Sequence, residues 1–136
     1  MTKKEALQEL TMQQEVVTEV PFEVILTSNR QRDVKYARDS FAIAGRLLLD
    51  SDAEITKYIN KKNTFYTALK KRHRIRVERA DKYQDKYAIK YLDIFNKLMY
   101  LTELLLRKTE MNGGEILAEN LTTYHRIIRS YKTNLT

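Results

Sequence analysis

The chain has 136 residues with one proline, three glycines and no cysteine, which favours a single domain (1–136) and excludes disulfides and thiolate metal sites. Hydrophobic residues make up 43% and charged residues 32%, which is enough for a folded core beneath a charged surface. The N-terminal stretch MTKKEALQELTMQQEV is too charged for a signal peptide. No stretch approaches the roughly 18 apolar residues of a membrane span, so we expect a soluble, cytoplasmic protein.

The net charge of +7 is concentrated in one part of the chain. Residues 28–79 contain 14 Lys and Arg against six Asp and Glu, a net charge of +8, and the remaining residues carry −1. A positive segment beside a nearly neutral scaffold is typical of a face that binds a polyanion. Nucleic acids and acidic proteins are both partners of this kind.

Apolar spacing predicts helices throughout the first part of the chain. The expected elements, in chain order, are helices at 3–19, 22–26, 34–49 and 53–59, with a basic loop at 28–33, a polar turn at 60–63 and another helix from Thr64. Pro21 ends the first helix, and Asp50-Ser51-Asp52 breaks the third and caps the fourth. The short turn before Thr64 gives residues 21–76 the outline of a helix-turn-helix.

The second part of the chain predicts a helical hairpin at 77–136. Apolar residues recur at helical spacing from Tyr83 to Leu105, and no breaker is visible before Asn112-Gly113-Gly114, so we expect one helix of about 30 residues. A last helix at 115–131 would fold back on it. The sequence therefore predicts an all-α fold, with a helix-turn-helix core followed by a long C-terminal helical hairpin, and a homodimer through residues 83–131.

Val34, Ala37 and Arg38 form a Val-x-x-Ala-Arg pattern after the basic residues of 28–33, and Glu54 and Ile55 form a Glu-Ile pair in the helix before the turn. By these features, residues 22–72 resemble the C-terminal DNA-binding domain of the bacterial replication initiator DnaA, a helix-turn-helix related to the Trp repressor. That family has the same Val-x-x-Ala-Arg pattern at its basic loop and the same Glu-Ile pair. The family's recognition helix starts Asp-His-Thr-Thr-Val, where this chain has KNTFY (62–66) and shares one threonine. The family's ATPase part has no counterpart, because a Gly-rich phosphate loop is missing from the sequence.

A recognition helix enters the major groove with its N-terminal end first, so its first polar side chains reach base edges and later lysines reach phosphates. The predicted base-reading residues are Asn63, Thr64 and Thr67, and the predicted phosphate contacts are Lys61, Lys62, Lys70 and Lys71. The resemblance implies that Arg30 or Arg32 of the basic loop enters the adjacent minor groove. Lys35 and Arg38 complete the predicted DNA-binding set.

Two functions remain open from the sequence. The first is a double-stranded DNA-binding protein that acts as a regulator, or as a replication or packaging accessory factor, of a phage or other mobile element. The alternative is an all-helical adaptor whose basic face docks an acidic protein, because a second apolar face at 89–106 could receive a partner helix. RNA binding ranks below both, because an aromatic platform and a Gly-rich loop are missing from the sequence.

Other features of the sequence have plainer interpretations. The run KKRHRIR (70–76) is also compatible with an ordinary cationic surface, and His73 is expected on that solvated face. His125 is the only other histidine, so we expect no metal site. Tyr83, Tyr87 and Tyr91 are interpreted as a packing stripe rather than a base-stacking platform. We expect no cofactor, no small-molecule substrate and no enzymatic activity.

Overall fold

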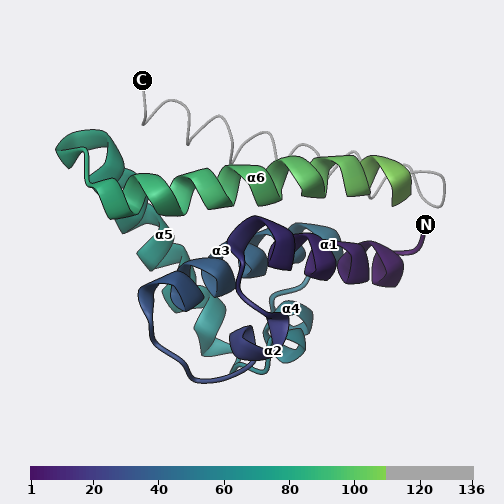
Figure 1. Ribbon diagram of the computed structural model, residues 1–136. Coiled ribbons are helices and arrows are strands. Elements are labelled where there is room, and N and C mark those ends of the chain that lie inside the picture. The colour runs from purple at the N-terminus through teal and green to yellow at the C-terminus, as the bar shows by residue number, and fades with distance from the viewer. Residues whose placement is uncertain (110–136) are drawn as a thin grey trace.

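The computed structural model describes residues 1–109, which form six α-helices and no strand (Figure 1), and this confirms the predicted all-α class. The helices are α1 (Lys3–Thr18), α2 (Phe22–Ile25), α3 (Arg32–Leu49), α4 (Asp52–Tyr58), α5 (Thr64–Tyr83) and α6 (Lys86–Thr109). The predicted helix at 115–131 lies outside the described residues, so the C-terminal hairpin stays a prediction.

Local signals in the sequence explain where α1 begins and ends. Thr2 and Glu5 form a capping box, in which the Thr2 hydroxyl accepts from the Glu5 backbone and the Glu5 carboxylate accepts from the Thr2 backbone. At the other end, Glu19 adopts a left-handed conformation with φ 60°, and Pro21 follows two residues later. The chain then turns directly into α2.

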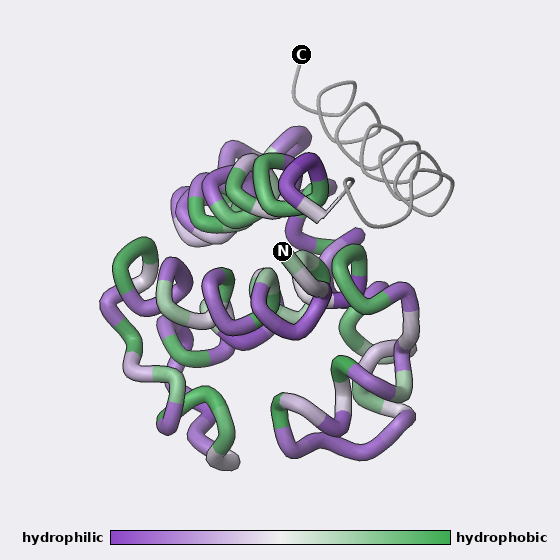
Figure 2. The backbone as a smooth tube through the Cα atoms, turned by 90° about the vertical axis from the view of Figure 1, so that its right-hand side faces the viewer, coloured by the Kyte–Doolittle hydropathy of each residue, from purple (hydrophilic) through white to green (hydrophobic). Residues whose placement is uncertain are grey.

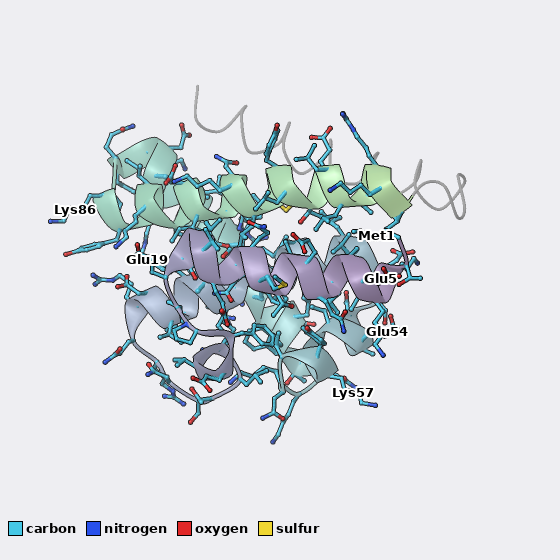
Figure 3. All side chains as sticks on the ribbon, turned by 45° about the vertical axis from the view of Figure 1, so that its right-hand side comes forward. Met1, Glu5, Glu19, Glu54, Lys57 and Lys86 are labelled. Carbon is cyan, nitrogen blue, oxygen red and sulfur yellow. The ribbon has the colours of Figure 1, made fainter. Side chains whose placement is uncertain are left out.

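Helix α6 covers the rest of the fold and packs on α3, α1 and α5. Helices α1 and α6 run antiparallel, because Lys86 at the start of α6 lies near Glu19, while Met1 and Glu5 lie at the opposite end (Figure 3). One cluster of buried apolar side chains draws residues from all six helices, with Phe41 and Phe95 among its largest members. Hydrophobic and hydrophilic residues alternate along the helices (Figure 2), as expected for amphipathic elements around one core.

Gly45 allows α4 to approach α3 closely. A Cβ atom at this position would lie 2.5 Å from Cδ1 of Ile55, which is itself completely buried. The absence of a side chain therefore matters here for packing, and it lets α4 contribute Ile55 to the core.

The prediction of one long helix from Tyr83 to residue 111 is wrong, because the chain breaks between α5 and α6. Gln84 adopts a left-handed conformation with φ 50°, and Asp85 then caps α6 by accepting hydrogen bonds from the backbone of Tyr87 (2.9 Å) and Ala88 (3.1 Å). The turn between the two helices is visible at the end of α5 in Figure 1. Across this break the tyrosine stripe is lost: Tyr83 is 74% exposed and Tyr87 is exposed, whereas Tyr91 is fully buried.

The second apolar face of α6 is largely covered within the fold. Leu92, Met99 and Leu106 are buried, and Ile89 is the exposed member of that face. Within residues 1–109, none of the helices has both the length and the apolar character needed to cross a membrane.

Candidate nucleic-acid interface

The α2–α3 loop and the turn before α5 lie next to each other, although 34 residues separate them in the chain. The Lys61 ammonium donates to the Thr27 carbonyl at 3.0 Å, and the Asn60 side chain donates to the Leu26 carbonyl at 3.3 Å. Asn60 reaches this position in a left-handed conformation with φ 61°. The structure therefore places side by side the two segments that the sequence predicts to bind DNA.

Hydrogen bonds between side chains and backbone shape the α2–α3 loop. The Thr27 hydroxyl donates to the Val24 carbonyl and accepts from the Asn29 backbone, while the Asn29 side chain accepts from the Gln31 backbone. This pattern leads directly into α3, whose first residue is Arg32, two residues before the predicted start. The loop thus holds Arg30 and the start of α3 in a defined place.

Arg38 supports this loop from inside the protein and is only 5% exposed, contrary to the prediction that it contacts DNA. Its guanidinium donates to three backbone carbonyls, those of Ile25 (2.8 Å), Thr27 (2.8 Å) and Asn29 (3.1 Å). The planar guanidinium offers five N–H donors in a fixed arrangement, and each of its three nitrogen atoms donates to a different carbonyl. Arg38 therefore positions the loop and is not available to a phosphate.

The first turns of α5 present polar side chains to solvent. Asn63, Thr64 and Thr67 are all exposed, and their side chains make no hydrogen bond to any residue within 1–109. Tyr66 and Leu69 on the opposite side of the helix are buried in the core. The start of α5 is thus anchored by its apolar face, and the three predicted base-reading side chains remain free.

Positive side chains continue along the exposed side of α5. Lys62, Lys70 and Lys71 are exposed, as predicted. Arg74 is also exposed and lies three and four residues beyond Lys71 and Lys70, so it shares their side of the helix, although it is missing from the predicted set. The spacing of the KKRHRIR run could have identified it.

Lys61 differs from its neighbours because it is partly buried against the loop. Burial, followed by repulsion from Arg38 and Arg30, lowers the pKa of Lys61 below its ordinary value. The influence of Arg30 on this lysine indicates that the loop and the turn share one positive field. Lys61 therefore links the two segments by a hydrogen bond and also contributes to the charged surface.

Arg32 and Lys35 are exposed on the first turns of α3, on the side that faces the end of α5 and the start of α6. The Arg32 guanidinium lies 3.6 Å from the centre of the Tyr87 ring, a cation–π contact that fixes its position. These residues and Arg30 line a concavity together with Arg76 and Arg79, two arginines that the predicted set does not include.

A buried carboxylate attaches α5 to α3. Asp39 is 2% exposed and accepts hydrogen bonds from Arg72 (3.0 and 3.1 Å) and Arg76 (2.7 Å). His73 lies between these two arginines in sequence and contacts Tyr91 and Phe95 of α6, so its predicted place on a solvated face is wrong. These contacts fix the orientation in which α5 presents its outer side.

Three carboxylates of α3, α4 and the turn between them are paired with arginines. Asp39, Asp50 and Asp52 are bound by arginines, with Arg46 serving the last two. By contrast, the side chains of Arg30, Lys62, Lys71 and Arg74 make no ion pair in the described part of the chain. Residues 1–109 contain no group of three His, Cys, Asp or Glu side chains arranged to bind a metal ion.

Comparison with known proteins finds no family model, no curated protein and no solved structure that matches this chain. The resemblance of residues 22–72 to the initiator domain therefore stays a prediction.

Proposed function

We propose that this protein binds double-stranded DNA by placing the N-terminal end of α5 in the major groove. The observation that carries the proposal is the Lys61–Thr27 contact, which holds the basic α2–α3 loop beside the free polar start of α5. A helix that projects N-terminus first, with a basic segment fixed at its side, is the arrangement by which helix-turn-helix proteins contact bases and backbone together.

Asn63, Thr64 and Thr67 are the proposed base-reading residues. An Asn side chain can pair with adenine through two hydrogen bonds, and a Thr methyl group can contact the methyl group of thymine. Because these three side chains have no partner among the described residues, they lose no internal hydrogen bond when they meet a base. Sequence preference is therefore expected to depend on Asn63 most strongly.

The remaining positive side chains are proposed to contact phosphates. Lys62, Lys70, Lys71 and Arg74 flank the base-reading residues, and the exposed Arg30 belongs to the loop that Lys61 joins to the start of α5. Phosphate contacts give affinity and fix the position of the protein on the duplex, whereas they carry no sequence information directly. Lys61 keeps its structural bond to the loop and adds charge to the same field.

Such a protein would act as a regulator, or as a replication or packaging accessory factor, of a phage or other mobile element. A homodimer through residues 83–131 would pair two half-sites and raise specificity. The adaptor alternative loses its main support, because the apolar face that motivated it is buried at Leu92, Met99 and Leu106.

The proposal can be tested by fluorescence anisotropy with a random duplex of about 30 base pairs over a series of salt concentrations. We expect Lys62→Ala/Lys70→Ala/Lys71→Ala to weaken binding by about 10- to 100-fold and to reduce the slope of log affinity against log salt by about 3. The matched control is Lys3→Ala/Lys4→Ala/Lys108→Ala, which removes the same charge from exposed positions outside the candidate interface.

Sequence preference is tested separately by selecting preferred sites from a random pool. Asn63→Ala should change the selected site and leave the salt dependence intact. Equal binding by the interface variant and the control variant would show that the charge of α5 does not touch DNA. No binding by the wild type at about 50 mM salt would refute the proposal and return the question to a protein partner.

A further inference from the structure

A positively charged concavity lies at the end of α5 farthest from the proposed base-reading residues. It has a volume of about 560 Å³ and is bounded by the α2–α3 loop, the start of α3, the end of α5 and the start of α6. Its lining residues are Arg30, Arg32, Lys35, Tyr36, Arg76, Arg79, Asp85, Tyr87 and Ala88. In Figure 3 the label of Lys86 marks this end of α6, opposite Met1.

Positive charge dominates the lining of the concavity. Five of its residues are Arg or Lys and one is acidic, and that one, Asp85, already accepts two backbone hydrogen bonds as the cap of α6. The Asp39 carboxylate, which pairs with Arg76, also accepts a hydrogen bond from Arg72. The charged ends of Arg30, Lys35 and Arg79 make neither a hydrogen bond nor an ion pair within residues 1–109. Cations gathered at one concave surface repel each other, and binding of an anion relieves this repulsion.

The two tyrosines of the concavity restrict the kind of anion. Arg32 covers the ring of Tyr87 at 3.6 Å, and the Arg76 guanidinium lies 4.8 Å from the ring centre of Tyr36. Tyr87 also contacts the Lys86 ammonium, and Tyr36 is only 8% exposed and packs against Tyr91, so both rings are already occupied by cations or by other side chains. Recognition must come from charge and from the N–H donors of arginine, which match the oxygen atoms of phosphate.

We infer that this concavity is a second phosphate-binding site, separate from the base-reading end of α5, and that its ligand is a run of clustered phosphates. If the proposed function holds, these phosphates belong to the backbone of the same duplex. Arg30 connects the two surfaces, because it lines the concavity and also repels the Lys61 ammonium at the turn before α5. A free polyphosphate has the same chemistry, and the experiment separates the two sources.

The test uses Lys35→Gln/Arg79→Gln, two exposed positions whose charged groups support no other described side chain. The matched control is Lys3→Gln/Lys4→Gln, which removes the same charge at the Met1 end of the molecule. Each protein is titrated with inorganic tripolyphosphate by calorimetry at low salt. By anisotropy, each is also titrated with a duplex of about 25 base pairs over a series of salt concentrations. Circular dichroism confirms that both variants are folded.

Loss of tripolyphosphate binding in the Lys35/Arg79 variant alone would support the phosphate site. A loss of about 10-fold in duplex affinity in this variant, with a salt slope reduced by about 2 and the control unaffected, would assign the site to the DNA backbone. Loss of tripolyphosphate binding with duplex binding unaffected would assign it to a free polyphosphate.

The inference is overturned if the Lys35/Arg79 variant binds both tripolyphosphate and the duplex like the control. If the wild type does not bind the duplex, the proposed function fails, and the tripolyphosphate titration still decides whether the concavity binds phosphate.

Discussion

The Nδ1 atom of His73 lies 2.8 Å from the hydroxyl oxygen of Tyr91, and this contact joins the middle of α5 to α6 inside the protein. The His73 ring also packs 4.6 Å from the ring of Phe95, measured between ring centres. Burial and, to a smaller extent, the positive charge of Arg76 lower the pKa of His73 from 6.5 to about 4, while the negative charge of Asp39 acts in the opposite direction. Burial likewise raises the pKa of Tyr91, so its hydroxyl stays protonated.

Stability is therefore expected to fall as the pH decreases from 6.5 towards 4. Over this range the unfolded chain binds a proton at His73 while the folded protein does not, so protonation favours unfolding. The loss should reach at most about 3 kcal/mol at pH 4, and it is absent above pH 6.5. Urea denaturation at pH 7 and pH 4.5 measures it. His73→Phe should remove this part of the pH dependence, and parallel curves for wild type and variant would contradict the assignment.

Asp39 should contribute far more to stability than Asp33, although both are carboxylates in the first half of α3. Asp39→Asn weakens two buried ion pairs and leaves Arg72 and Arg76 without a balancing charge, so we expect a loss of about 2–4 kcal/mol in the free energy of unfolding. Asp33 pairs with Lys90 at 3.5 Å on the surface, and Asp33→Asn should cost less than about 0.5 kcal/mol. Urea denaturation of both variants makes the comparison, and equal losses would show that Asp39 is not a structural anchor.

Substitutions of Arg38 and Arg30 should affect the stability of the protein and its DNA affinity differently. Arg38→Met removes the side-chain donor to the Ile25 and Asn29 carbonyls and leaves the Thr27 carbonyl with the Lys61 ammonium alone, so we expect a loss of about 2–4 kcal/mol in stability together with weaker DNA binding. Arg30→Met removes an exposed charge, so DNA affinity should fall while the melting temperature stays within about 2 °C of wild type. Thermal denaturation and anisotropy report the two effects. Unchanged stability in Arg38→Met would contradict the role given to this arginine.

Gly45→Ala should destabilise the protein even though alanine favours helix formation by about 1 kcal/mol over glycine. The new methyl group would meet Cδ1 of Ile55, so this fully buried side chain must shift within the core, and overpacking of this kind costs about 1–3 kcal/mol. Ile55→Val removes that Cδ1 atom. In the Ile55→Val background, Gly45→Ala should therefore be neutral or stabilising, and a double-mutant cycle by urea denaturation measures the coupling. Additive effects would rule out the clash.

The sequence predicts the helices whose signals are local and misses features that depend on distant neighbours. The start of α1 and the turn before α5 follow from capping residues and apolar spacing, and both lie where they are expected. The break at Gln84 was missed because the left-handed residue is a glutamine rather than a glycine, and because the tyrosine spacing continues across it. The residue before α6, Asp85, is the one local signal that could have indicated a new helix.

The same distinction applies to the candidate site. Residues 61–71 could be identified from sequence, because exposure of charged residues on an amphipathic helix follows from its period. The burial of Arg38 could not, since it depends on three carbonyls that the α2–α3 loop brings together only in the folded chain. Arg76 and Arg79 were missed for the same reason, because the concavity exists only where the ends of α3, α5 and α6 meet.

Helix α5 also fixes the distance between the two proposed contact surfaces. Thr64 at its start and Arg79 near its end are separated by about 22 Å of continuous helix, which is less than the roughly 34 Å of one turn of a B-form duplex. Taken together, the two proposals mean that one rigid helix holds the base-reading residues and the phosphate-binding site at a fixed distance from each other. An A-form RNA duplex, whose major groove is too narrow for a helix, would not accommodate this arrangement. The protein would thus select its nucleic acid by the geometry of the duplex before any base is read.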